Sequence, residues 1–460
     1  MVQQIRKTLE MKRKIYQEML LWKKKRSTKE ALLIDGARRV GKSWIVEEFA
    51  KNEYDSYLLI DFSNTPNAIR RLFVDYEGQL DSFFMHLMLE TGVKLHKRKS
   101  LIIFDEIQNF PKARQAIKHL VRDGRYDYIE TGSLMSINAN VKGINIPSEE
   151  HRIDMYPMDF EEFLWALGDD MMMEYARECF AEKKPLGQSL HRKMMEYFRL
   201  YMIVGGMPQA VQEWIETKDF DEVDHVKRNI LSLYRGDISK YASGQEVKVT
   251  KIFDTIPSQL QKHEKKFRLS ALHIGARSRN LENAFFWLEE SRVVNFCFAA
   301  TEPTVGIEMR LDDSARKIYM ADTGLLISHA FSEAKIRAEE LYRKLMHDKI
   351  ELNKGMLVEN IVAQMLRASG HKLFFFSSYS KTNADERMEI DFLISKQVIG
   401  SRHNIHPIEV KSTSRYSLAS LNKFSAKYHT AIAEPIILHS SDLKIEDGKI
   451  FLPLYMTELL

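Results

Sequence analysis

The sequence predicts a multidomain α/β protein, and three observations indicate this fold class. Between residues 31 and about 135, short apolar runs alternate with helical periodicity, which is typical of a parallel sheet covered on both faces. Helical patterns dominate from about 158 to 290 and are followed by two apolar runs that suit a β-ribbon. From about 345 to 460, strand and helix patterns mix again. A chain of 460 residues has room for about three domains.

Composition is that of an ordinary globular protein, with 44% hydrophobic and 29% charged residues. Because 68 basic residues stand against 64 acidic ones, the net charge is only +4, so a nucleic-acid surface would have to be a local patch. The two cysteines, Cys179 and Cys297, are far apart in sequence and support neither a disulfide framework nor a zinc site. A reducing compartment is expected.

No segment of the sequence predicts secretion or a membrane span. The N-terminal stretch MVQQIRKTLEMKRKIYQEML is interrupted by charges and lacks the apolar centre of a signal peptide. No run of about 18 apolar residues occurs. We therefore expect a cytoplasmic protein with no membrane partner.

The first third of the chain carries the clearest pattern. Residues 4–26 have apolar positions at helical spacing and predict a helix. Four strongly apolar runs follow and predict buried parallel strands. These runs are ALLID (31–35), SYLLIDF (56–62), LIIFD (101–105) and YDYIET (126–131).

The strongest motif directly follows the first of these strands. Eight residues fit G-x-x-x-x-G-K-[ST], the P-loop pattern, and the helical stretch SWIVEEFAKN comes next. Glycines let backbone N–H groups curl around phosphate oxygens, and the helix N-terminus favours negative charge. The sequence therefore predicts an ATP site in which Lys42 reaches the β- and γ-phosphates and Ser43 ligates Mg²⁺. The motif consists of Gly36, Ala37, Arg38, Arg39, Val40, Gly41, Lys42 and Ser43.

Further nucleotide-site candidates follow along the chain. LIIFDEIQ ends a strand in two carboxylates, so Asp105 is expected to hold Mg²⁺ through water and Glu106 to polarise the attacking water. Two solvated acids at a strand end are the alternative. In YIETGS, Thr131 or Ser133 could contact the γ-phosphate, although an ordinary turn also fits. Arg152 is a candidate cation for the γ-phosphate, with a plain surface role as the alternative.

A family resemblance extends these predictions to nearly the whole chain. It is carried by GARRVGKS, DEIQNF, TGS, MYPMDFEEFLWALG, YFRLYMIVGGMPQAV, IPSQL, KKFRLS, WLEE and YMADTGLL, in this order. With them the chain resembles the bacterial and archaeal P-loop ATPases that carry the domain of unknown function 4143. The resemblance implies an AAA-type ATPase domain (1–165), a helical domain (166–245), a winged-helix-like domain (246–335) and a nuclease-like domain (340–460).

The winged-helix region also has support in the residues themselves. The stretch 269–296 reads as short helices followed by apolar strands, with Asn280–Glu290 in the place of a recognition helix. Arg277 and Arg279 precede this helix, where phosphates of DNA could be met. Its aromatic residues suit packing, and a protein contact is the alternative to DNA.

The C-terminal part contains a second group of charged residues. Asp391 lies in the strand EIDFLI, and Glu409 and Lys411 lie two apart in IHPIEVKS, which places them on one face. Glu359 lies in a preceding helix. The spacing is similar to that of the PD-(D/E)XK nucleases, which have a restriction-endonuclease-like fold. This resemblance implies that Asp391 and Glu409 hold Mg²⁺ and that Lys411 steadies the nucleophile. A simple ion-pair cluster is the alternative.

Together these patterns predict a Mg²⁺-dependent ATPase coupled to a nuclease-like domain that binds or cleaves DNA. The alternative is a regulatory ATPase whose winged-helix and C-terminal domains bind protein or nucleic acid without cleavage. ATP and Mg²⁺ are the expected cofactors. DNA, a protein partner and a second copy of the chain are the candidate partners.

Overall fold

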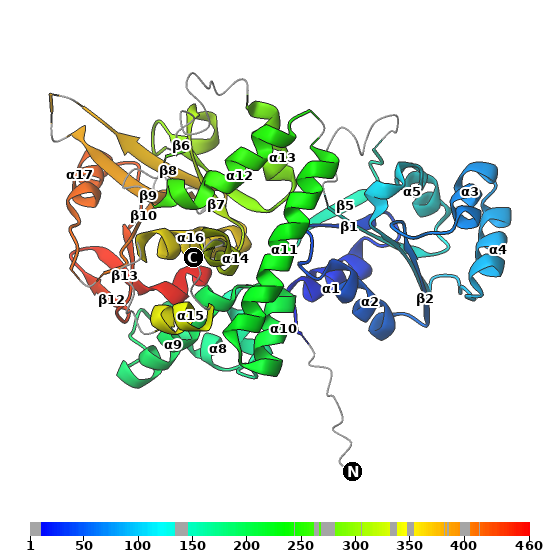
Figure 1. Cartoon of the computed structure of the whole chain (residues 1–460), viewed down its shortest axis with the longest axis horizontal. Coiled ribbons are helices and arrows are strands. Elements are labelled where there is room, and N and C mark those ends of the chain that lie inside the picture. Colours follow the sequence, from blue (N-terminus) through cyan, green and yellow to red (C-terminus); the bar gives the residue numbers. More distant parts are fainter. Residues whose placement is uncertain are drawn as a thin grey trace, which may run out of the picture. The chain divides into compact units, whose positions relative to one another are not determined.

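The chain folds into two compact units (Figure 1). The smaller unit contains Lys12–Tyr156 and Glu290–Arg292, and the larger contains Pro157–Glu289 and Val293–Leu460. No described helix is long and apolar enough to cross a membrane. The computed structural model describes residues 11–133, 146–242, 244–261, 266–267, 281–304, 306–331, 338–346, 354–380, 382–383, 386–395, 405–413 and 415–460.

A five-stranded sheet forms the centre of the smaller unit. Every neighbouring pair of strands is parallel, and the order is β2-β3-β4-β1-β5. This confirms the predicted parallel sheet and its four apolar strands; the fifth strand, EHRID, has no comparable apolar run and was not predicted. The strands are β1 (Ala31–Asp35), β2 (Ser56–Asp61), β3 (Ser100–Asp105), β4 (Asp127–Gly132) and β5 (Glu150–Asp154).

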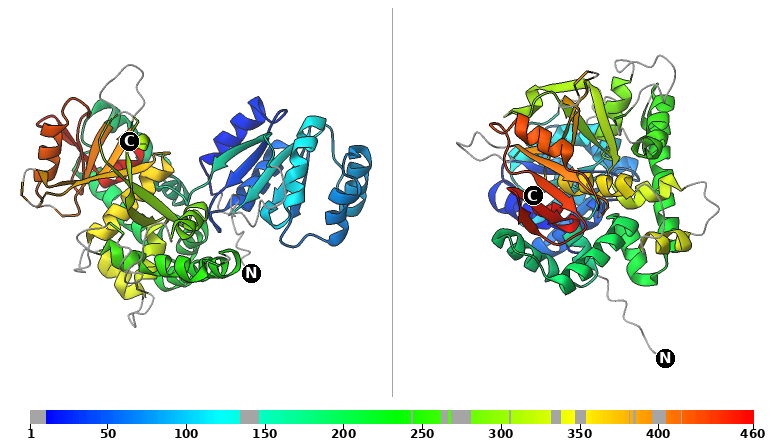
Figure 2. Two further views of the ribbon diagram at one scale, coloured as in Figure 1. Left: turned by 90° about the horizontal axis from the view of Figure 1, so that it is seen from above. Right: turned by 90° about the vertical axis from the view of Figure 1, so that its left-hand side faces the viewer.

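Helices cover both faces of this sheet (Figure 2). On one face α2 packs against β2, β3 and β4. On the other, Phe73, Phe84 and Ile117 from three helices meet Leu33 and Phe104 from the strands in one buried core. The predicted N-terminal helix begins at Ile15, and residues 4–10 lie outside the described part. The helices are α1 (Ile15–Lys25), α2 (Lys42–Glu53), α3 (Asn67–Asp75), α4 (Leu80–Thr91), η1 (Ile107–Asn109) and α5 (Pro111–Asp123).

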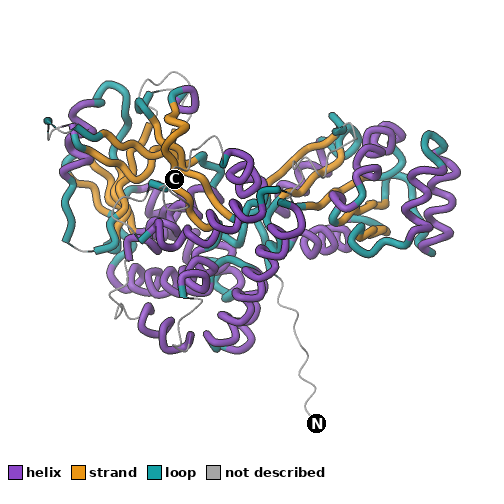
Figure 3. The backbone as a smooth tube through the Cα atoms, turned by 45° about the horizontal axis from the view of Figure 1, so that its top comes forward, coloured by secondary structure: helices purple, strands orange, loops and turns teal. Residues whose placement is uncertain are grey.

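The larger unit combines a group of helices with a second sheet (Figure 3). Its first helix, α7, starts at a capping box in which Asp159 and Glu162 each accept a hydrogen bond from the other's backbone N–H. The helices are α7 (Phe160–Ala166), α8 (Met172–Glu182), α9 (Gln188–Val204), α10 (Pro208–Thr217), α11 (Phe220–Tyr241), α12 (Glu246–Leu260), α13 (Glu282–Glu290), η4 (Ile307–Met309), α14 (Thr323–Ala330), α15 (Ala338–Met346), α16 (Lys354–Ala368), α17 (Ala419–Lys427) and η6 (Leu454–Leu459).

Eight strands form the second sheet, in the order β12-β13-β11-β10-β9-β8-β6-β7. The predicted β-ribbon is confirmed, because β6 and β7 pair in antiparallel fashion. β6 also pairs in parallel with β8, which joins the ribbon to the C-terminal strands. The strands are β6 (Val294–Ala300), β7 (Leu311–Met320), β8 (Leu373–Ser378), β9 (Met388–Ser395), β10 (Ile405–Val410), β11 (Ile436–His439), β12 (Lys444–Glu446) and β13 (Lys449–Pro453).

The continuous sheet bears on the predicted domain division. The expected boundary near 335–340 falls inside one compact unit and between strands of one sheet. The four-domain division stays a prediction, as does the winged helix. Within the latter, α13 covers most of the proposed recognition helix, and its Ala284, Phe285, Trp287 and Leu288 are buried. Arg277 and Arg279 lie outside the described residues.

Buried polar contacts hold the VGGMP and ADTGLL segments together. The carboxylate of Asp322 accepts hydrogen bonds from the backbone N–H of Gly206, at 2.6 Å, and of Leu325, at 2.8 Å. A Cβ atom at Gly206 would collide with the carbonyl oxygen of Met158. The close approach of the two backbones therefore requires glycine at position 206. The carboxylate of Asp322 also caps the N-terminus of α14.

The helix α16 adds amide side chains to this network. Asn360 accepts from the N–H of Met320 at 2.9 Å and donates to its carbonyl oxygen at 3.1 Å. Gln364 accepts from the N–H of Thr323 at 2.8 Å and donates to the hydroxyl of Tyr201 at 2.9 Å. Because these groups are buried, every partner is needed to offset the loss of water.

Replacing Asp322 with alanine should destabilise the larger unit. The change leaves two buried N–H groups without an acceptor and removes a helix cap, at a cost of about 2–4 kcal/mol. Thermal and urea unfolding would measure the loss. The matched control is Asp219→Ala, which removes an exposed cap from α11 and should have a clearly smaller effect. Equal effects of the two changes would contradict this account.

Candidate functional site

The motif 36–43 consists of the loop 36–41 after β1 and the first two residues of α2, as a P-loop requires. A Cβ atom at Gly36 would collide with the carbonyl oxygen of Met155, and Gly41 has a φ of 97°, which favours glycine. Arg13 supports the loop by donating to the carbonyl oxygens of Val40, at 2.8 Å, and Tyr156, at 2.7 Å. Sequence reasoning missed Arg13, because nothing local marks a contact made 27 residues away.

Lys42 is the first residue of α2, and its side chain contacts the loop that precedes the helix. Its Nζ donates to the carbonyl oxygens of Gly36, at 2.8 Å, and Ala37, at 3.0 Å. Burial lowers the pKa of this lysine, and the nearby carboxylates of Glu106 and Asp35 oppose that effect. The ammonium is thus held by weak neutral acceptors, which an anionic group could replace.

The ends of β3 and β4 and the start of α2 bring three oxygen-bearing side chains together. The hydroxyl of Ser43 donates to Oδ1 of Asp105 at 2.9 Å, and the hydroxyl of Thr131 donates to the same oxygen. Burial raises the pKa of Asp105, while these two hydrogen bonds oppose the rise. A hydroxyl beside a carboxylate fits Mg²⁺, which prefers oxygen ligands and keeps several waters. Thr131 therefore contacts Asp105, whereas a contact with the γ-phosphate stays a prediction.

Glu106 occupies a left-handed backbone conformation, with a φ of 51°, directly after β3. Such a conformation is uncommon for a residue other than glycine and turns the chain sharply into η1. Gln108 donates to Oε2 of Glu106 at 2.5 Å, and the N–H of Glu106 points to Thr131 Oγ1 at 3.4 Å. The side chain is held at the same sheet edge as Asp105, where a water-activating group would be needed.

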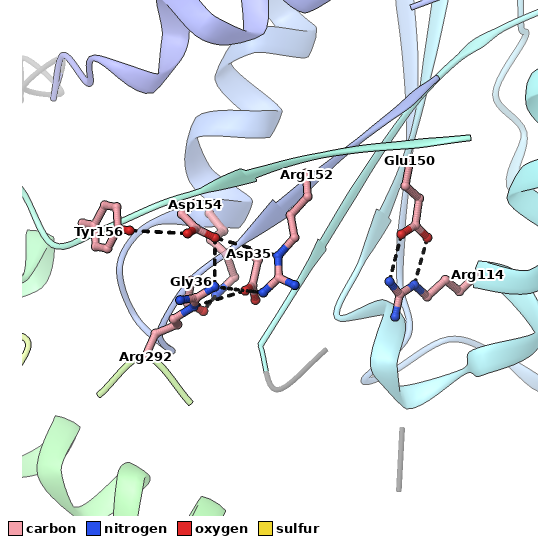
Figure 4. Close-up of polar contacts among 9 residues, drawn as sticks. Asp35, Gly36, Arg114, Glu150, Arg152, Asp154, Tyr156 and Arg292 are labelled. Carbon is pink, nitrogen blue, oxygen red and sulfur yellow. Dashed lines mark hydrogen bonds and ion pairs between the residues drawn. The ribbon is translucent and has the colours of Figure 1, made fainter. Parts of the chain in front are cut away.

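Arg152 lies on β5 and forms an ion pair with Asp35, the last residue of β1 (Figure 4). Arg292 approaches the same Asp35 oxygen at 3.4 Å and binds Asp154 at 3.1 Å. Asp35 is almost completely buried. The two arginines therefore balance the charge of Asp35, which is the residue immediately before the P-loop. Arg292 was not found from the sequence, since it follows Arg152 by 140 positions.

A second ion pair lies further along the same side of the sheet (Figure 4). Arg114 of α5 contacts both carboxylate oxygens of Glu150, at 2.9 and 2.8 Å, and both side chains are buried. Glu130 on β4 is fully buried, and burial together with the charge of Glu150 raises its pKa well above the usual range. The Arg114–Glu150 pair joins α5 to β5.

The four C-terminal residues named from the sequence lie in one region of the larger unit. Lys411 donates to Oε1 of Glu409 at 2.6 Å. Oδ2 of Asp391 accepts from the backbone N–H of Val410 at 2.9 Å. Burial and the neighbouring Asp391 raise the pKa of Glu409 to about 8. Glu359 on α16 is 2% exposed and joins the group through a residue that sequence reasoning missed.

That residue is Lys317 of β7. It is fully buried, and its Nζ lies 3.2 Å from Glu359, 3.1 Å from Glu389 and 3.9 Å from Asp391. Burial alone would lower its pKa, yet the carboxylates of Glu389 and Asp391 raise it, so the ammonium stays charged. A lysine directly before the apolar run IYM was the available signal, because a charge inside a buried strand requires a partner.

Replacing Thr131 with valine should weaken the use of Mg²⁺. The change removes the hydroxyl that fixes Asp105, and loss of such a supporting contact costs about 10- to 100-fold in metal affinity or activity. A magnesium titration of ATP turnover would measure it. The matched Thr131→Ser variant keeps the hydroxyl and should restore most activity. An unchanged magnesium dependence in the valine variant would show that Asp105 needs no such support.

Solved structures of other proteins align with this chain over much of its length, and two of them are described next. The Walker-type ATPase PABY2304 of Pyrococcus abyssi aligns over 69% of this chain and 95% of its own, with 14% identity and a TM-score of 0.39. CDC6P from Pyrobaculum aerophilum aligns over 73% of this chain and 93% of its own, with 12% identity and a TM-score of 0.23. Both likenesses are too low to add to the argument.

Three family models match successive parts of the sequence. A model described as an AAA domain matches residues 28–164, DUF8612 matches 195–336 and DUF4143 matches 354–458; the last two are domains of unknown function. No curated protein matches. The expected combination of an AAA domain with DUF4143 is confirmed. Together with the P-loop geometry, the AAA match supports ATPase function for the smaller unit.

Proposed function

We propose that the smaller unit binds ATP with Mg²⁺ and hydrolyses it at the carboxyl edge of its parallel sheet. The observation that carries this proposal is the contact of Asp105 with both Ser43 and Thr131, which joins the P-loop to the ends of β3 and β4. A ligand at the carboxyl ends of parallel strands, facing a helix N-terminus, is the usual arrangement for phosphate binding in α/β proteins.

In this proposal each loop residue has a defined task. The backbone N–H groups of the loop and the start of α2 bind phosphate oxygens. Lys42 leaves the carbonyl oxygens of Gly36 and Ala37 and contacts the β- and γ-phosphates, exchanging neutral acceptors for charged ones. Ser43 and Asp105 would hold Mg²⁺, which neutralises charge that develops on the phosphate oxygens.

Glu106 is the proposed residue that orients and polarises the attacking water, with Gln108 fixing its carboxylate. Arg152 is the proposed cation for the γ-phosphate. It would have to exchange Asp35 for the phosphate, and Arg292 would then remain as a partner of Asp35. A buried Asp35 thus keeps a counter-charge in either state, as its burial demands.

For the larger unit we propose binding of a protein or nucleic-acid partner without cleavage. This was the alternative function expected from the sequence. The supporting observation is that Lys317 and Lys411 already pair with carboxylates that a divalent cation would need. ATP turnover in the smaller unit would regulate the binding of this partner. The proposal includes no cleavage of DNA.

The Lys42→Ala variant should bind ATP about 10- to 100-fold more weakly, because a charged hydrogen-bond donor to phosphate is lost. Titration with a fluorescent ATP analogue would measure the dissociation constant. Lys51→Ala is the matched control, because Lys51 lies on the same helix, is exposed and forms an ion pair with Glu47. Equal affinities for ATP in both variants would refute the P-loop assignment.

The Glu106→Gln variant should keep ATP affinity and lose about 100- to 10,000-fold in turnover, because it retains the shape but not the basicity of the carboxylate. Steady-state phosphate release together with ATP binding would separate the two effects. Loss of binding along with turnover would show instead that Glu106 supports the loop. Full turnover would remove Glu106 from the proposed chemistry.

A further inference from the structure

The carboxylates of the larger unit surround the ammonium of Lys317. Three of them lie within 4 Å of its Nζ: Glu359 at 3.2 Å, Glu389 at 3.1 Å and Asp391 at 3.9 Å. The ring of Phe375 lies 5.0 Å from the same nitrogen. With no part of Lys317 exposed, these contacts replace its water shell. The ammonium therefore occupies the centre of the carboxylate group, where a cation is required.

Most of the oxygens that could face a metal already have other partners. Glu359 Oε1 accepts from the hydroxyl of Tyr319 as well as from Lys317. The second oxygen of Asp391 accepts from the backbone N–H of Val410. Lys411 pairs with Oε1 of Glu409, whereas Oε2 of Glu409 is buried without a hydrogen-bond partner among the described residues. Two lysines thus supply positive charge to the same carboxylates that the nuclease pattern would give to Mg²⁺.

These residues do not fit a Mg²⁺ site. Magnesium demands near-octahedral oxygen coordination at about 2.1 Å, and a buried ammonium in the same space repels a dication. Over the described part of the chain, no group of three or more His, Cys, Asp or Glu side chains is arranged to hold a metal ion. Asp391, one of the two expected metal ligands, lies 3.9 Å from the ammonium of Lys317.

We propose that Lys317 replaces the divalent cation of this cluster as a permanent internal counter-ion, so that the larger unit needs no metal there. The strand β7, which carries Lys317, is thereby tied to α16 through Glu359 and to β9 through Glu389 and Asp391. The next residues of β7 and α14 continue the contact with α16 through Asn360 and Gln364. The lysine is thus the charged end of a structural network.

This inference deepens the non-cleaving role proposed for the larger unit and is independent of ATP hydrolysis by the smaller one. The first measurement is binding of Mn²⁺, a spectroscopic probe for Mg²⁺, to the nucleotide-free full chain by electron paramagnetic resonance. The wild type and Asp391→Asn should bind Mn²⁺ alike. A stoichiometric Mn²⁺ site in the wild type that Asp391→Asn removes would overturn the proposal.

The second measurement removes the internal cation. Lys317→Met keeps the length of the side chain and should create a Mn²⁺ site at least about 100-fold tighter than any at this position in the wild type, because the repelling charge is gone. Adding Asp391→Asn should abolish the new site. Lys372→Met is the matched control, since it removes an exposed lysine paired with Glu308 and should create no site.

Circular dichroism shows first whether the Lys317→Met variant is folded. If Lys317→Met is folded and gains no Mn²⁺ site, the proposal fails. If Lys317→Met does not fold, the wild-type comparison with Asp391→Asn decides alone. ATP turnover of the wild type is measured in parallel. Absence of turnover counts against the ATPase proposal for the smaller unit only, and the Mn²⁺ results count for or against the role of Lys317 only.

Discussion

A charged side chain that leaves water must meet an opposite charge or a full set of hydrogen bonds, and this constraint shapes both units. Asp105 is buried and held by two hydroxyls, and Asp35 is buried between arginines. In the larger unit, Asp322 accepts two backbone N–H groups and Lys317 is enclosed by carboxylates. Apart from the local cap that Asp322 forms with Leu325, each of these contacts joins segments far apart in the sequence, so the buried charges also stabilise the tertiary structure.

The parallel sheet explains why the nucleotide-site residues converge. In such a sheet all carboxyl ends lie at one edge, so the last residues of β1, β3 and β4 meet there although they are separated by tens of positions. Asp35, Asp105 and Thr131 occupy those last positions or the ones beside them. The strand order, with β1 between β4 and β5, also brings Arg152 beside Asp35. The local sequence thus determines which residue ends each strand, and the strand order brings these residues together at one edge of the sheet.

The sequence was informative where the signal is local. Buried apolar runs predicted β1 to β4 and the β6–β7 ribbon, and the P-loop pattern placed Lys42 between a strand and a helix. β5, β12 and β13 were not predicted. Most residues of β5 and β12 are polar and half-buried or exposed, so the pairing of these two strands depends on neighbouring strands rather than on their own composition. Arg13, Arg292 and Lys317 were missed for a related reason, since a long-range ion pair leaves no periodic pattern in the sequence.

The parallel pairing of β6 with β8 limits how the two segments of the larger unit can be recombined with other proteins. Two family models divide the larger unit between 336 and 354, yet the sheet crosses that division, because β6 and β7 come from one side and β8 to β13 from the other. A graft of the 354–458 segment onto another ATPase would leave β8 with an open edge and Glu359 without Lys317. The two segments are therefore expected to be inherited together, as one evolutionary unit.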